Sequence, residues 1–109
     1  MRTYDIRDAS GKVFAFEVGN LLLSRRRACD VVRTIPGAII LSEARFRLFS
    51  NDDVFCQFEL DGQRFKIWEP FGDNSRYWVG PEPPRWCEQV AVVREAFSRF
   101  KPFALRRVA

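Results

Sequence analysis

The sequence of 109 residues contains no histidine, so it lacks the side chain that proteins use most often as a general base and as a metal ligand. Its three cysteines, Cys29, Cys56 and Cys87, are an odd number at wide spacing, which fits neither a zinc site nor a disulfide framework. The six glycines are scattered and form no phosphate-binding loop. We therefore predict buried free thiols, and we assign no catalytic residue, metal or cofactor.

Long apolar runs are also missing. No stretch approaches the roughly 20 apolar residues that a membrane-spanning helix needs. The first ten residues, MRTYDIRDAS, lack the apolar core of a signal peptide, so we expect a cytoplasmic protein without membrane contact. A hydrophobic content of 47% is enough for one packed core. We expect a single domain over residues 1–101, followed by a basic tail over residues 102–109.

The net charge of +4 is concentrated at the C-terminus. The last eleven residues carry four basic side chains and no acidic one, which leaves 14 basic against 14 acidic residues in the rest of the chain. The basic character is therefore a property of the tail and not of a continuous binding face. This distribution weakens the case for a nucleic-acid-binding protein.

Two hairpins are predicted from their turns. Near the N-terminus, the loop ASG is flanked by alternating apolar residues, and pairing Asp8 with Lys12 would align Ile6 with Phe14. The second turn is the dipeptide DG at positions 61–62, the strongest short hairpin signal in the chain. Its two-residue length would align Cys56 with Ile67 on the core face.

The same register would align Phe55 with Trp68 on the opposite face of the second hairpin, beside Gln57 and Lys66. This second face is amphipathic, so it is a candidate contact surface.

Two helices are predicted from apolar spacing of three and four residues. The first follows Asn20 or Ser24, and its apolar positions are Ala28, Val31, Val32 and Ile35. The last follows the prolines at 83–84, and its apolar stripe is Trp86, Val90, Val93, Phe97 and Phe100. The order ββα-βββ(β)-α predicts an α+β fold, an antiparallel sheet of about five to six strands with two helices packed on one face. Residues 76–79 are expected to form a short strand at a sheet edge.

The three tryptophans fall within nineteen residues, 68–86, close to other aromatic and charged side chains. Such clusters are typical of interface hot spots and ligand clefts. We predict a binding site made of Phe55, Trp68, Glu69, Phe71, Asp73, Arg76, Tyr77 and Trp78. The predicted function is a small non-catalytic binding domain with an accessory, inhibitor, immunity or regulatory role. It would engage a protein partner, or self-associate through an edge strand.

Two alternatives remain open. The first is nucleic-acid binding through an arginine-rich face and the basic tail, with Arg25, Arg26, Arg27, Arg106 and Arg107 as contacts. The second is small-ligand binding, or an enzymatic role, at Glu69, Asp73 and Arg76, where charged groups flank a turn.

Overall fold

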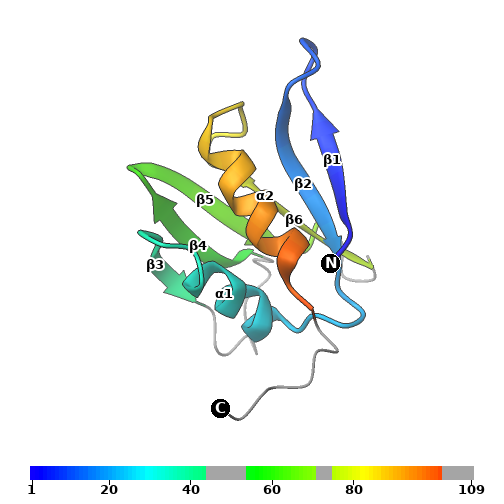
Figure 1. Cartoon of the computed structure of the whole chain (residues 1–109), viewed down its shortest axis with the longest axis vertical. Coiled ribbons are helices and arrows are strands. Elements are labelled where there is room, and N and C mark those ends of the chain that lie inside the picture. Colours follow the sequence, from blue (N-terminus) through cyan, green and yellow to red (C-terminus); the bar gives the residue numbers. More distant parts are fainter. Residues whose placement is uncertain (44–53, 71–74, 102–109) are drawn as a thin grey trace.

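A computed structural model describes residues 1–43, 54–70 and 75–101. These residues form a six-stranded antiparallel sheet and two helices, which confirms the predicted fold class and element order (Figure 1). The strands are β1 (Thr3–Arg7), β2 (Val13–Gly19), β3 (Ile39–Glu43), β4 (Val54–Leu60), β5 (Gln63–Trp68) and β6 (Arg76–Pro81). The helices are α1 (Arg25–Arg33) and α2 (Gln89–Arg99).

The last strand lies in the middle of the sheet. The strand order is β1-β2-β6-β5-β4-β3, so β6 pairs with β2 on one side and with β5 on the other. The prediction that residues 76–79 form an edge strand is therefore wrong. The physical reason is burial, because Tyr77 and Val79 need apolar neighbours on both sides, and only a central position supplies them. Among the described strands, the two edges are β1 and β3.

The first hairpin has the predicted turn but a different register. The amide of Asp8 donates to the carbonyl of Lys12 at 2.9 Å, which confirms the turn. A register shift after Ile6 then aligns this residue with Ala15, so the predicted alignment with Phe14 is wrong. An extra residue in one strand of an antiparallel pair, a β-bulge, moves every later partner by one position.

A second register shift changes the place of Phe55. The pairs Phe58–Phe65 and Cys56–Ile67 form as predicted, but Val54, and not Phe55, lies opposite Trp68. Phe55 turns into the core, where it is 2% exposed and its ring packs 4.9 Å from that of Tyr77. The predicted Phe55–Trp68 pair is therefore wrong, since the bulge inserts Phe55 between two paired positions.

Both helices cover the same face of the sheet (Figure 1). The side-chain oxygen of Ser24 caps α1 by accepting a hydrogen bond from the amide of Arg27. Of the two caps predicted from the sequence, Asn20 and Ser24, the structure therefore selects Ser24. Phe97 of α2 is fully buried, and its ring packs edge-on against that of Phe16 in β2, with centroids 5.6 Å apart. These contacts place the hydrophobic core between the two helices and one sheet face.

Trp86 does not belong to this core. The structure confirms Val90, Val93 and Phe97 as buried residues of α2, but the helix begins only at Gln89. Trp86 therefore precedes the first helical turn and is 47% exposed, with the Lys12 ammonium 4.3 Å from its ring centre. The predicted apolar stripe extended the helical spacing across residues that follow two prolines and are not helical.

Phe97→Ala should lower the free energy of unfolding by about 3–5 kcal/mol, because it removes a large, fully buried ring. Val92→Ala, on the same helix but at a position 49% exposed, is the matched control and should cost about 0.5 kcal/mol or less. Urea unfolding followed by far-ultraviolet circular dichroism measures both. Equal losses in the two variants would contradict the described core.

Candidate functional site

The candidate site is the sheet face opposite the helices, which we call the open face. Side chains alternate along a strand, and residues paired across neighbouring strands share a face. The cross-strand pairs therefore assign to the open face Tyr4, Ile6, Ala15, Glu17, Gly19, Ile39, Ser42, Val54, Gln57, Glu59, Arg64, Lys66, Trp68, Arg76, Trp78 and Gly80. In the described parts of the chain no helix packs on this face, since α1 and α2 both lie on the other side (Figure 1).

Trp68 and Trp78 lie at the centre of the open face. They are direct partners on β5 and β6, and their rings meet edge to face with centroids 6.4 Å apart. The ammonium of Lys66 lies 5.3 Å from the Trp68 ring and 5.7 Å from the Trp78 ring. One cation is thus held by two half-buried indoles.

Gly80 and Ala15 make room for Trp78. A Cβ atom added to Gly80 would lie 2.6 Å from Cη2 of Trp78 and 2.8 Å from Cβ of Ala15. The indole therefore lies over the backbone of its own strand, where two small residues on β2 and β6 leave space. Both residues are missing from the sequence-based site, although a glycine inside a strand is a known sign of a close approach.

Beside the tryptophans, Tyr4, Glu17 and Arg76 form a second group. The guanidinium carbon of Arg76 lies 3.5 Å from the centre of the Tyr4 ring, and its Nη1 lies 3.3 Å from Oε1 of Glu17. The guanidinium of Arg2 also lies 5.2 Å from the Tyr4 ring. Tyr4 and Glu17 were not predicted, because only the observed pairing of β1, β2 and β6 brings them beside Arg76.

Glu69 takes part in a different structure. Its carboxylate accepts from Nη2 of Arg25 at 2.5 Å and from Nδ2 of Asn20 at 3.0 Å. Arg25 is the first residue of α1, so Glu69 ties the start of this helix to the end of β5. Glu69 and Arg76 thus have different described partners, and the ligand site at Glu69, Asp73 and Arg76 stays a prediction. Phe71 and Asp73 lie outside the described residues.

The three consecutive arginines of α1 also have separate environments. Arg25 pairs with Glu69, the guanidinium of Arg27 lies 5.1 Å from the ring of Phe100, and Arg26 is exposed. The structure does not gather them on one face. Arg106 and Arg107 lie outside the described residues.

Tyr77 and two of the cysteines are buried in the core. Burial, with a smaller contribution from the charge of Glu69, raises the pKa of Tyr77 to about 12. Cys29 and Cys56 are free thiols with no exposed surface, as predicted, and their mutual hydrogen bond together with burial raises the pKa of Cys29. The third, Cys87, is only partly buried.

Within residues 1–43, 54–70 and 75–101, no group of three acidic, cysteine or histidine side chains is arranged to hold a metal ion.

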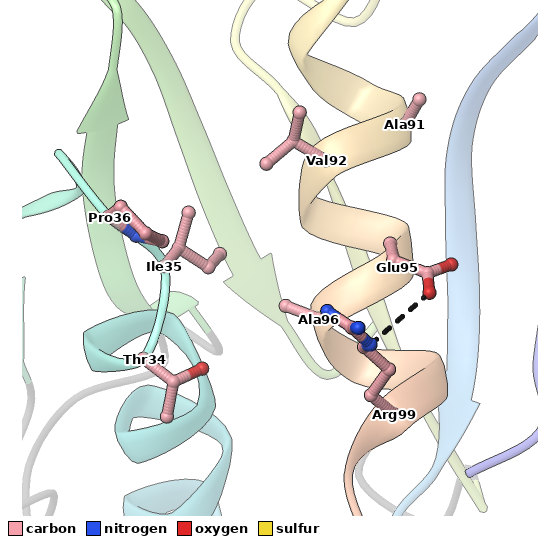
Figure 2. Close-up of a pocket in the computed structure, with 8 residues that line it drawn as sticks. All are labelled: Thr34, Ile35, Pro36, Ala91, Val92, Glu95, Ala96 and Arg99. Atoms are coloured by element: carbon pink, nitrogen blue, oxygen red, sulfur yellow. Dashed lines mark ion pairs between the residues drawn. The ribbon is translucent and has the colours of Figure 1, made fainter.

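A separate hollow of about 540 Å³ lies between the end of α1 and the exposed side of α2 (Figure 2). Its walls are mostly apolar, and the Glu95–Arg99 ion pair of 3.5 Å lies at one end. Its lining residues are Thr34, Ile35, Pro36, Ala91, Val92, Glu95, Ala96 and Arg99. No residue of the predicted site lines this hollow.

No described helix is long and apolar enough to cross a membrane.

Gly80→Ala should displace the Trp78 ring and lower the free energy of unfolding by about 1–3 kcal/mol, because the new methyl group overlaps the indole. Gly19→Ala, in the adjacent strand β2, meets nothing within 4 Å and is the matched control. It should leave the stability unchanged or raise it by up to about 1 kcal/mol. Urea unfolding gives the stabilities, and the tryptophan emission maximum reports the ring displacement. Equal behaviour of the two alanine variants would contradict the position of Trp78.

The raised pKa of Tyr77 predicts a loss of stability at high pH. An unfolded tyrosine has a pKa of about 10, so between pH 10 and 12 the unfolded chain releases this proton while the folded chain retains it. Stability should fall as pH rises through this window, by up to about 2.7 kcal/mol in total. Urea unfolding at pH 9 and pH 11.5 measures the loss. Tyr77→Phe should reduce it, whereas Tyr4→Phe, on the open face, should not.

Searches for similarity find no protein-family model, no curated protein and no solved structure that matches this chain.

Proposed function

We propose that this chain is a small binding domain that engages a protein partner through its open face. The observation that carries the proposal is the Trp68–Trp78 pair, half-buried on a face that no described helix covers. Tryptophan, tyrosine and arginine are the residues most enriched in interface hot spots. All three types occur together on this face, with Tyr4 and Arg76 beside the indoles.

The geometry favours a protein over a single-stranded nucleic acid. Base stacking needs an accessible aromatic ring face. Here the chain's own cations lie over the rings, with Arg76 on Tyr4 and Lys66 near both indoles. The separate environments of Arg25, Arg26 and Arg27 give the nucleic-acid alternative no further support.

The role is accessory, inhibitory, protective or regulatory within the cytoplasm. The buried free thiols of Cys29 and Cys56, which form no disulfide although they contact each other, support a reducing compartment. Self-association is the second form of this proposal, in which the partner is another copy of the chain.

Trp78→Ala and Trp68→Ala should each weaken partner binding at least about tenfold, as truncation of a hot-spot residue does. The wild-type chain is used to capture the partner from native extract, and mass spectrometry identifies it. Titration calorimetry with the purified partner then gives the affinities, and light scattering tests for a second copy. Trp86→Ala is the matched control, because this tryptophan is exposed but lies outside the open face.

Circular dichroism must show that each variant is folded. If both open-face variants are folded and bind the captured partner with wild-type affinity, the proposed function is wrong.

A further inference from the structure

The open face carries an excess of positive charge. Among the described residues, its cations are Arg64, Lys66 and Arg76, with Arg2 over the Tyr4 ring, and its two carboxylates are Glu17 and Glu59, which gives these groups a net charge of +2. Two arginines on the helix side are matched by carboxylates. Arg33 pairs with Asp30 and Glu43, and Arg94 donates two hydrogen bonds to Asp5.

Lys66 is the cation that contacts both indoles. Arg76 has Glu17 as an ion-pair partner, and Arg64 lies directly across from Glu59. Within the described part of the chain, no carboxylate lies within ion-pair distance of the Lys66 ammonium. Its described contacts are the two indole rings, which attract a cation but leave its charge in place.

A second donor at this point also lacks a partner. The indole N–H of Trp68 is buried, and no acceptor among the described residues takes its hydrogen bond. An unsatisfied buried donor costs about 1–3 kcal/mol. The centre of the open face thus combines a charged donor, an unmatched neutral donor and apolar ring surface, and what it lacks is an anionic acceptor.

We propose, building on the function proposed above, that the partner presents an acidic segment, and that one of its carboxylates binds Lys66 between Trp68 and Trp78. The indoles exclude water from part of the ammonium's surroundings, which strengthens its attraction for a carboxylate. Apolar atoms of the same segment pack on the ring surfaces. Together these contacts select a chain that is acidic and partly apolar.

The positions of Glu17 and Glu59 favour an acidic protein segment over a nucleic acid. Both carboxylates lie on the open face and would repel a phosphate backbone. Nucleic-acid grooves follow the backbone with an uninterrupted series of cations, whereas here Glu17 and Glu59 lie among the cations. A protein segment can place one carboxylate at Lys66 and uncharged side chains opposite Glu17 and Glu59, whereas a phosphate backbone is charged at every nucleotide.

The experiment uses the full chain with Trp86→Phe, so that the fluorescence of the remaining tryptophans reports only Trp68 and Trp78. The probes are an octapeptide of alternating glutamate and alanine, the matching octapeptide of glutamine and alanine, and a ten-nucleotide oligothymidine. The acidic peptide should give a saturable change in emission. Its affinity should be at least about tenfold higher than that of the glutamine peptide and should fall as salt is raised.

Lys66→Gln should weaken acidic-peptide binding about tenfold, whereas Lys66→Arg should retain most of it, because arginine keeps the charge. Lys12→Gln is the matched control, since Lys12 in the wild-type chain also lies over an indole, that of Trp86, but away from the open face. It should leave the affinity unchanged. Circular dichroism confirms that each variant is folded.

Three results would overturn the acidic-segment proposal: absence of acidic-peptide binding, equal affinities for the two peptides, or an equal effect of Lys66→Gln and Lys12→Gln. In each case the proposed function survives if Trp78→Ala still abolishes capture of the protein partner. Tighter binding of oligothymidine than of the acidic peptide, lost in Lys66→Gln, would assign the face to nucleic acid and overturn both proposals.

Discussion

The pairing of β6 with β2 is the constraint on which the rest of the structure depends. Without it, the β1–β2 hairpin and the four-stranded β6–β5–β4–β3 sheet are separate, and a two-stranded hairpin alone is marginally stable at best. The joint places Tyr77 and Val79 under the helices, and alternation then places Trp78 and Gly80 on the open face. One strand therefore contributes to both the core and the candidate site. A substitution that moves β6 would affect stability and binding together.

The Glu69 carboxylate has a related role on the helix side. It holds Arg25 at the start of α1, and the guanidinium of Arg25 also lies 5.0 Å from the ring of Phe55. Three elements, α1, β4 and the end of β5, therefore meet at one partly buried ion pair. Such a pair is costly to break from one side, because the remaining charge stays in poorly hydrated surroundings. Glu69 is thus best explained as a structural residue that orients α1 over the sheet.

The sequence predicted the elements whose signals are local. The turn at 61–62, the cap at Ser24 and the spacing of Val90, Val93 and Phe97 each depend on neighbours within one hairpin or helix, and each is confirmed. The bulges and the position of β6 depend on contacts between distant segments. For this reason the sequence missed the burial of Phe55 and the central strand order.

In the candidate site, too, the sequence indicated the residues with a local signal and missed those that depend on pairing between distant strands. The sequence indicated Trp68 as a large aromatic residue on the amphipathic face of the second hairpin, and Trp78 as a large aromatic residue in the segment that follows this hairpin. Gly80, Ala15 and Tyr4 complete the face only through the β2–β6 pairing, which no local pattern encodes. The role of Lys66 depends on its position between two rings that are ten residues apart in sequence and adjacent in the sheet.

A tryptophan pair on a sheet face that no described helix covers is a hazard as well as the proposed binding surface. Exposed aromatic surface on a sheet attracts any apolar partner, including other copies of the chain. The ammonium of Lys66 opposes such association, because an apolar partner would bury it without a counter-ion. A partner that brings a carboxylate neutralises the charge as it covers the rings, so it avoids this cost. The same lysine therefore penalises unspecific contacts and favours acidic ones, and the difference between the two free energies sets the specificity of the face.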